Sequence, residues 1–360
     1  MTKATGQQDE ELAVESSDFW TRSPGVIRSF LEKRPDYEQL CNEIRYTLEK
    51  RLSKDGIEFS TITARAKTLN RFLDKMARKK YRNPFSEITD FAGVRVVCLY
   101  VDDITLIEKI IEDEFVVVEK VDKLTDKEPD QFGYGAIHYI VKLGKKSAGA
   151  RYDDLRAYVC EIQVRTVLQD AWAIIGHHLV YKRESAVPKA LQRKLNSLAG
   201  LFETADDQFQ QVRNERERYL ARVTDSRKSA KAFLSNETNL DSMKQYLAWK
   251  FPALPLDVAS WQLQAVFGDI DLKLYPTLSE IEGLIREEEA RVALVFQKAA
   301  ESFAKKDGKI PSCMNLGISL ALRNPALLDD YSPEVHAAVE AVRADAGPNK
   351  PDAGDTKKRA

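Results

Sequence analysis

Hydrophobic positions along this 360-residue chain follow two patterns, one typical of β-strands and one typical of α-helices. The strand pattern ends near residue 190, which divides the chain into two parts. Up to about residue 190, short runs of β-branched and aromatic residues alternate with stretches of helical spacing. Strands are predicted over residues 57–64, 91–100, 115–121, 134–143 and 158–164. Helices are predicted over residues 24–52, 65–81, 102–111 and 166–182.

Beyond residue 190 only helical spacing continues. The predicted helices span residues 191–223, 243–250, 260–267, 278–305, 315–323 and 333–344. Strands and helices in the first part do not alternate regularly, which disfavours a doubly wound parallel sheet. We therefore expect an α+β domain over residues 20–190 and an all-helical region over residues 191–345. The polar ends, residues 1–19 and 346–360, are expected to be disordered.

Composition excludes several classes of protein. Hydrophobic residues make up 43% of the chain, enough for a sizeable core, and the net charge of -1 gives no global attraction to nucleic acid or membrane. The four cysteines lie far apart without a C-x-x-C pair, so neither a disulfide framework nor a metal clip is expected. No apolar run reaches the roughly 18 residues that span a bilayer, and the N-terminus lacks signal-peptide features. These features fit a reducing cytoplasm.

Basic residues gather on the predicted helix over residues 65–81 and directly after it. Eight basic residues face a single acidic one, Asp74: Arg65, Lys67, Arg71, Lys75, Arg78, Lys79, Lys80 and Arg82. Arg71, Lys75 and Lys79 are four residues apart, so on a helix they would form a row on one face and repel one another. The cluster is therefore either a solvated basic face or a cradle for polyphosphate, which guanidinium groups bind bidentately.

Two charged residues accompany the apolar strand over residues 91–100. Asp90 directly precedes it and is either a turn former or a ligand for Mg²⁺, which prefers hard oxygen donors. Arg95 lies inside the strand, where a charge is costly unless it is paired or points into a site.

Three polar residues, Glu161, Gln163 and Arg165, alternate with apolar residues in C-E-I-Q-V-R-T. Because side chains alternate between the faces of a strand, the three share one face. That face is either exposed to solvent or the floor of a site.

Glycines flank the aromatic residue Tyr134 just before a predicted strand that carries His138. Tyr134 offers a ring that stacks on any nucleotide base. His138 either contacts phosphate or is an ordinary hydrogen-bonded histidine. The adjacent pair His177 and His178 lacks the spacing of three or four that a helical metal site needs, so zinc is not expected.

Together and in this order, these segments resemble the synthetase domain of RelA/SpoT-type alarmone synthetases. The resemblance covers about residues 40–210, and four stretches carry it: R-A-K-T-L-N-R-F-L-D-K-M (Arg65–Met76), I-T-D-F-A-G-V-R-V-V (Ile88–Val97), G-Y-G-A-I-H-Y (Gly133–Tyr139) and E-I-Q-V-R-T-V-L-Q-D-A-W-A (Glu161–Ala173). It implies a mixed β-sheet flanked by helices, related to nucleotidyltransferases. It also implies a GTP pyrophosphokinase that moves the β,γ-pyrophosphate of ATP to the 3′-hydroxyl of GDP or GTP, making the alarmone (p)ppGpp of the stringent response.

The resemblance implies a role for each matching residue. Mg²⁺ would be the cofactor, held by Asp90 and Glu161, and Glu161 would be either a ligand or the base for the 3′-hydroxyl. ATP would be bound by Arg65, Lys67, Lys75 and Arg95. The acceptor nucleotide would be bound by Tyr134, His138, Gln163 and Arg165, with Tyr134 stacking on the base.

The chain departs from the family pattern on the acceptor side. Many members have K-P-N-G-Y-R/Q-S where this chain has D-Q-F-G-Y-G-A over residues 130–136, and serine where it has Arg71. GDP or GTP is the expected acceptor. The tRNA 3′ end or an adenine nucleotide, as in toxin-like members, is the alternative, and the basic run over residues 78–82 fits RNA. A non-catalytic module is disfavoured because both expected carboxylates are retained.

No motif identifies the role of the helical region over residues 191–345. Its helices would regulate the synthetase, neutralise it in cis, or form a homo-oligomer interface. The expectation is therefore a small alarmone synthetase with a helical C-terminal extension, no membrane partner and a cytoplasmic location.

Overall fold

The computed structural model describes residues 21, 23–79, 81–122, 135–179, 188–254, 261–300 and 311–345. These residues divide into two compact units, one ending at Arg213 and one beginning at Asn214. The boundary expected at residue 190 falls at the start of a helix, and the division by contacts falls inside that helix. The ends expected to be disordered lie outside the described residues. None of the described helices is long and apolar enough to cross a membrane.

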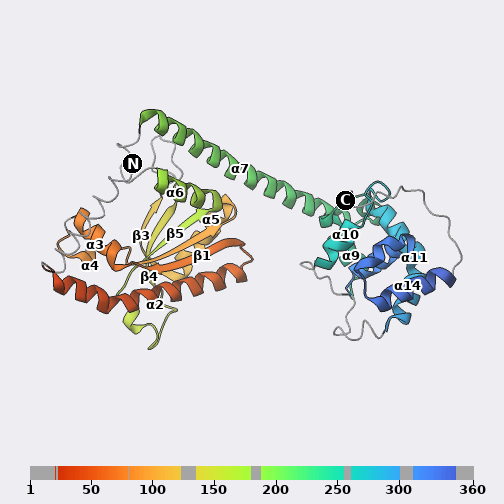
Figure 1. Cartoon of the computed structure of the whole chain (residues 1–360), viewed down its shortest axis with the longest axis horizontal. Helices are drawn as coiled ribbons and strands as arrows, with labels where there is room; N and C mark the ends of the chain where they lie inside the picture. Colours follow the sequence, from red (N-terminus) through yellow and green to blue (C-terminus); the bar gives the residue numbers. More distant parts are fainter. Residues whose placement is uncertain are drawn as a thin grey trace, which may run out of the picture. The chain divides into compact units, whose positions relative to one another are not determined.

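A five-stranded sheet forms the centre of the first unit (Figure 1). Its strands are β1 (Phe59–Ala66), β2 (Ala92–Cys98), β3 (Phe115–Asp122), β4 (Ile137–Leu143) and β5 (Cys160–Thr166). They lie in the order β1-β2-β5-β4-β3, with β2 and β5 parallel and the other neighbours antiparallel. The expected mixed sheet is confirmed.

One face of the sheet is apolar, and α2 (Pro24–Lys54) and α5 (Val101–Glu114) pack on it. Strand β5 shows how the sequence separates the two faces: Cys160, Ile162 and Val164 are fully buried, and the residues between them are partly accessible. Each buried aliphatic side chain stabilises the fold by about 1.5–3 kcal/mol. The packed face therefore holds the sheet in place and leaves the opposite, polar face available for a site.

The connection after β1 corrects one expectation. The helix predicted over residues 65–81 begins only at Leu69, as α3 (Leu69–Arg78), and Arg65 lies on β1 opposite Gly93. Thr68 is the N-cap, accepting a hydrogen bond from the Arg71 N–H at 3.4 Å. Threonine is a preferred N-cap residue, but the basic periodicity runs through it and extended the prediction too far. Lys79 has extended backbone angles, so it does not continue the predicted row of stacked cations.

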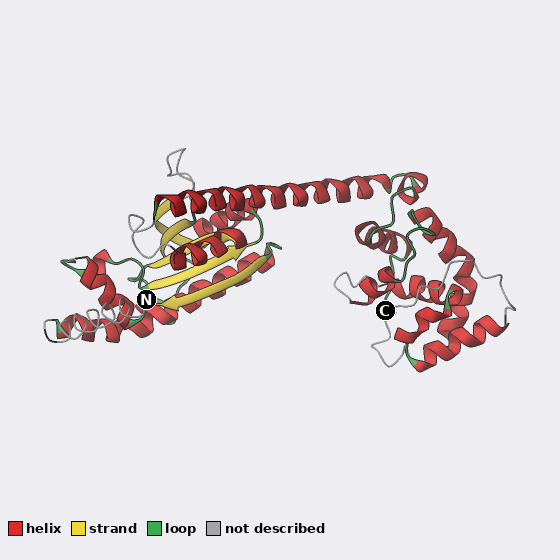
Figure 2. Cartoon of the chain, turned by 45° about the horizontal axis from the view of Figure 1, so that its top comes forward, coloured by secondary structure: helices red, strands yellow, loops and turns green. Residues whose placement is uncertain are grey.

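Further helices complete the first unit, the long α7 among them (Figure 2). They are α4 (Pro84–Glu87), the 3-10 helix η1 (Asp153–Leu155), α6 (Val167–Leu179) and the part of α7 (Lys189–Ser226) that ends at Arg213. The α6 helix follows β5 without a loop, and its Trp172 ring contacts Phe202 of α7 at 6.0 Å between centroids.

The second unit is helical, as expected. After the last turns of α7 it contains α8 (Ala230–Leu234), α9 (Leu240–Lys250), α10 (Trp261–Gly268), α11 (Leu278–Lys298), α13 (Cys313–Arg323), η3 (Pro325–Asp330) and α14 (Pro333–Asp345). Reciprocal capping boxes start α9 at Asn239 and α11 at Thr277. The α11 helix packs on α13 and α14 and joins two apolar clusters, one around Tyr246 and one around Val339. The short α8 was not predicted.

Candidate active site

Asp90 lies between two lysines just before β2. Lys67 Nζ is 2.7 Å from Asp90 Oδ2, and Lys75 Nζ is 2.9 Å from Oδ1. Lys67 belongs to the β1–α3 connection, where its backbone N–H bonds the Phe91 carbonyl at 2.7 Å, and Lys75 comes from α3. Burial opposes ionisation of Asp90, but the hydrogen bonds from both lysines outweigh it and lower its pKa. Asp90 is therefore a carboxylate at neutral pH.

An aromatic cluster anchors this carboxylate. Phe91 directly follows Asp90, is 2% exposed, and stacks on Tyr37 with 4.9 Å between ring centroids. Its ring also lies 5.5 Å from that of Phe72, which is one turn before Lys75 on α3. Buried aromatic contacts of this kind fix both sides of the Asp90–Lys75 pair. The position of the charged cluster thus depends on the core beneath it.

Glu161 is the second carboxylate, on β5. His138 Nδ1 lies 2.8 Å from Glu161 Oε1, and Gln163 Nε2 donates to Oε2 at 3.0 Å. His138 of β4 is opposite Gln163 in the antiparallel register, which brings its ring to this face. Burial disfavours the charged form of Glu161, but the hydrogen bond and charge of His138 overcome this and lower its pKa. Both carboxylates are therefore ionised acceptors.

A third carboxylate, Asp170 in the first turn of α6, joins two arginines. Its Oδ1 is 3.0 Å from Arg95 NH1 and 3.5 Å from Arg165 NH1. Arg165 NH2 also donates to Gln163 Oε1 at 2.7 Å. Hydrogen bonds and ion pairs therefore link Glu161, through Gln163 and Arg165, to Asp170 and Arg95. Burial and repulsion from the neighbouring Arg95 lower the pKa of Arg165, because the two guanidinium groups lie close together.

Asp170 was missed by the sequence reasoning, although it lies within the most specific of the four matching stretches. The available signal was an acidic residue in the first turn of a helix that directly follows a strand whose last residue but one is basic. Its importance depends on Arg95, which is 75 residues earlier in the chain. Neither periodicity nor local spacing reports a contact at that separation.

Arg65 lies in the same cross-strand row as Glu161. Arg65 of β1 pairs with Gly93 of β2, and Gly93 pairs with Glu161 of β5. Gly93 has no side chain to separate the other two. Burial, followed by repulsion from Arg71 and Arg95, lowers the pKa of Arg65. The positive charge of Arg65 is therefore only partly balanced by nearby carboxylates, and its guanidinium group suits an anionic ligand.

Nine of the ten residues predicted for the site lie among the described residues and belong to the Asp90 cluster, the Glu161–Arg95 chain or the Arg65 row: Asp90, Glu161, Arg65, Lys67, Lys75, Arg95, His138, Gln163 and Arg165. Tyr134, the tenth, lies outside the described residues, as does Phe132.

The donor set fits a magnesium ion. Asp90 and Glu161 are ionised, and the negative charge of Asp90 reaches Glu161, which places the two in electrostatic range of each other. Mg²⁺ is commonly held by one or two carboxylates together with water and phosphate oxygens. Within the described ranges no cluster of three or more His, Cys, Asp or Glu side chains suits a metal, so substrate oxygens would have to complete the shell.

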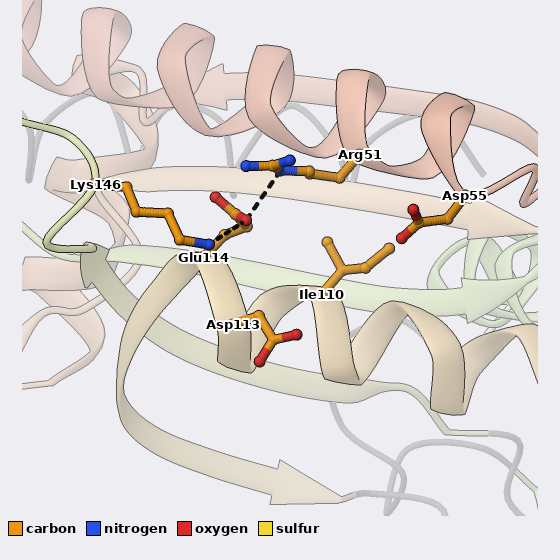
Figure 3. Close-up of a pocket in the computed structure, with 6 residues that line it drawn as sticks. All are labelled: Arg51, Asp55, Ile110, Asp113, Glu114 and Lys146. Atoms are coloured by element: carbon orange, nitrogen blue, oxygen red, sulfur yellow. Dashed lines mark hydrogen bonds and ion pairs between the residues drawn. The ribbon is translucent and has the colours of Figure 1, made fainter.

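A separate pocket of about 250 Å³ is lined by none of the predicted site residues. Glu114 lies within it between Arg51, at 2.9 Å, and Lys146, at 2.8 Å (Figure 3). Its other lining residues are Asp55, which follows the last residue of α2, and Ile110 and Asp113 of α5. The charged residues of the site thus lie outside this pocket.

Comparisons with known proteins agree on the first unit. Residues 64–186 match the family model described as "Region found in RelA / SpoT proteins". GTP pyrophosphokinase YjbM of Bacillus subtilis is 28% identical over 177 residues, covering 48% of this chain and 79% of that protein. GTP pyrophosphokinase YwaC of the same organism is 27% identical over 158 residues, covering 42% and 72%.

Among solved structures, small alarmone synthetase 1 from Bacillus subtilis matches with a TM-score of 0.45 and 25% identity, covering 53% of this chain and 98% of that one. A GTP pyrophosphokinase family protein from Streptococcus pneumoniae matches with a TM-score of 0.44 and 24% identity, covering 53% and 96%.

Proposed function

We propose, from the premise that residues 64–186 form a RelA/SpoT-type domain, that this chain is an ATP-dependent pyrophosphokinase. It would transfer the β,γ-pyrophosphate of ATP to the 3′-hydroxyl of GDP or GTP and so make (p)ppGpp in the cytoplasm. The observation that carries the proposal is a pair of ionised carboxylates, Asp90 and Glu161. They accompany the cations Arg65, Lys67, Lys75, Arg95 and Arg165. Both related proteins named above are GTP pyrophosphokinases.

The cations supply what this reaction needs most. Phosphoryl-type transfer requires alignment and neutralisation of charge more than covalent help from the protein. Lys67 and Lys75 neutralise Asp90 and each keeps ammonium protons for phosphate oxygens, because an ammonium group has three donors. Arg65 and Arg95 would bind the remaining phosphate oxygens. Binding in this arrangement would align the β-phosphorus with the acceptor hydroxyl.

Asp90 and Glu161 would hold Mg²⁺, which when bound would neutralise charge on the transferred phosphates. In the transfer, the acceptor 3′-oxygen forms a bond to the β-phosphorus, the bond from that phosphorus to the α-phosphate oxygen breaks, and AMP leaves. The hydroxyl proton would go to a Glu161 oxygen, which is ionised and therefore able to accept it.

The acceptor side would be formed by His138, Gln163 and Arg165, with Tyr134 stacking on the base. GDP or GTP is the proposed acceptor. The tRNA 3′ end or an adenine nucleotide is the second candidate, because the segment over residues 130–136 departs from the usual family pattern and a basic run follows α3.

One assay separates these acceptors. The full-length protein is incubated with γ-labelled ATP and Mg²⁺, and with GDP, GTP, AMP, ADP or deacylated tRNA in turn. Labelled guanosine tetra- or pentaphosphate supports the main proposal, and labelled tRNA or adenine nucleotide supports the second candidate. Absence of transfer to every acceptor by a protein with cooperative unfolding rejects both.

The helical region over residues 191–345 would regulate the synthetase or mediate homo-oligomer formation. All nine described site residues precede it, so a chain truncated after Ser226 should retain transfer activity. Activity and growth inhibition above those of the full chain would support an inhibitory role. A change in oligomeric state at unchanged activity per chain would support an interface.

A further inference from the structure

Helix α7 carries a buried carboxyl group that is hydrogen-bonded to the last residue of β5. Thr166 Oγ1, at the end of β5, donates a hydrogen bond to Asp206 Oδ2 of α7 at 2.6 Å. Asp206 is 3% exposed and Thr166 is 0% exposed. A buried carboxyl that bonds a side chain 40 residues earlier is costly to desolvate, so its contact calls for a specific explanation.

Thr166 is also the residue from which α6 begins. The Gln169 N–H donates to Thr166 Oγ1 at 3.1 Å, and the Thr166 N–H donates to Gln169 Oε1 at 2.9 Å. This reciprocal pattern is a capping box, which satisfies two backbone donors that the helix start would otherwise leave free. Because the hydroxyl accepts from Gln169, its single proton is directed to Asp206. Asp206 therefore selects the hydroxyl orientation that the cap requires.

The same helical turn carries Asp170. This residue follows Gln169 and binds both Arg95 and Arg165, and Arg165 itself directly precedes Thr166. The two guanidinium groups carry like charges, so Asp170 is what keeps them together. A small rotation of the first turn of α6 would move this carboxylate relative to both arginines.

We propose that Asp206 is a positioning residue for the site: through Thr166 it fixes the first turn of α6, and with it the Asp170 carboxylate that sets the positions of Arg95 and Arg165. The inference rests on the proposed pyrophosphokinase function, since it assigns Asp206 an effect on the arginines that would bind ATP and acceptor. Asp206 would touch neither reactant, because it contacts Thr166, whose side chain is on the buried face of β5. Helix α7 thereby becomes part of the machinery that shapes the site.

A purely structural role, in which Asp206 only fastens α7, makes different predictions. The helix has other attachments to the first unit: Arg213 NH1 lies 2.6 Å from Asp103 Oδ1, and the Arg213 guanidinium is 4.6 Å from the Tyr100 ring centroid. The Asp102 N–H also donates to Gln210 Oε1 at 3.1 Å. Loss of the Asp206 bond should therefore leave α7 docked while the start of α6 loosens.

The test combines kinetics with hydrogen–deuterium exchange on the full-length protein. Asp206→Ala removes the acceptor, and Asp206→Asn retains an acceptor oxygen. Thr166→Val removes the hydroxyl at nearly constant volume, and Thr166→Ser retains it. Asp207→Asn, at the neighbouring exposed residue, is the matched control.

We expect Asp206→Ala and Thr166→Val each to raise the KM values for ATP and for the acceptor by up to about tenfold, a size typical of residues that orient a binding group. The double variant should be no worse than Thr166→Val alone, because Thr166→Val already removes the bond to Asp206. Asp206→Asn, Thr166→Ser and Asp207→Asn should stay near wild type. Amide exchange in residues 167–170 should accelerate in the two defective variants, whereas exchange in residues 205–213 should not.

Wild-type KM and exchange in both Asp206→Ala and Thr166→Val would overturn the proposal, as would additive defects in the double variant. If Asp206→Ala does not fold, Asp206→Leu, which removes the acceptor but fills the same space, decides the question, because Thr166→Val also removes the acceptor of the Gln169 N–H. Exchange is measured without nucleotide. If the wild-type chain transfers pyrophosphate to no acceptor, the function fails, and the exchange data still show whether Asp206 holds the first turn of α6.

Discussion

His138 Nδ1 lies 2.8 Å from Glu161 Oε1, and the two residues come from neighbouring antiparallel strands. A carboxylate only accepts hydrogen bonds, so Nδ1 carries the proton in this pair. The bond favours the charged form of Glu161 and, against the opposing effect of burial, lowers its pKa. His138 of β4 therefore helps to keep Glu161, the proposed base, in its ionised form.

Replacing this histidine should move the pH dependence of transfer. In His138→Ala the Glu161 carboxyl keeps its burial but loses the hydrogen bond, so its pKa rises and activity on the acid side is lost at a higher pH than in wild type. The measurement is kcat against pH at saturating substrates. His138→Asn, whose amide can donate near the position of Nδ1, should restore part of the difference. Identical acid limbs in all three proteins would contradict the assignment.

Neutralising either carboxylate should abolish transfer. Asp90→Asn and Glu161→Gln each keep the shape of the side chain but remove a negative oxygen ligand and, at Glu161, the proton acceptor. We expect a loss of more than about a hundredfold in kcat/KM, with the melting temperature near that of wild type. Glu58→Gln, at an exposed residue on β1's N-terminal side, is the control and should be fully active. Full activity in either site variant would refute the metal-site assignment.

Removing Asp170 should weaken binding of both substrates. In Asp170→Ala the guanidinium groups of Arg95 and Arg165 lose their shared partner and repel each other. We expect the KM values for ATP and for the acceptor to rise together, by roughly tenfold each, because the cost of an unpaired, partly buried charge is on the order of 1–3 kcal/mol. Asp170→Asn should lie between. A rise in only one KM would show that the two arginines act independently.

The sequence predicted all five strands because each is a short run of β-branched and aromatic residues with apolar positions on one face. The shared face of Glu161, Gln163 and Arg165 follows from the same alternation, and their roles stay predictions. Arg65 was placed on a helix because basic residues have no strong preference between strand and helix, and only the cap at Thr68 marks the change. Asp206 escaped notice because it is one of two adjacent aspartates in a polar helix, and sequence does not distinguish it from the solvated Asp207. The burial of Asp206 is set by contacts with β5 that local sequence does not encode.

Burial gives Asp206 an unusual titration. Desolvation, together with the negative charge of Asp207, raises its pKa to about 7, well above the value near 3.9 of an unfolded chain. The Cys98 thiol of β2 lies within electrostatic range of both Asp206 and Asp103 of α5. Because the folded protein binds this proton more tightly than the unfolded chain does, the stabilisation is fully present below about pH 4.

That stabilisation should be lost progressively as the pH rises through 7. The free energy of unfolding of wild type should therefore fall between pH 5 and pH 8, by on the order of 2 kcal/mol. Asp206→Asn carries no titrating group and keeps an acceptor for Thr166, so its curve should be flatter and should lie above wild type at pH 8. Urea unfolding at pH 5, 6, 7 and 8 measures both curves, with Glu203→Gln, at an exposed residue one turn earlier on α7, as control. Histidine titration affects all three proteins alike and cancels in the comparison, so parallel curves for wild type and Asp206→Asn would mean that Asp206 is ionised throughout this range.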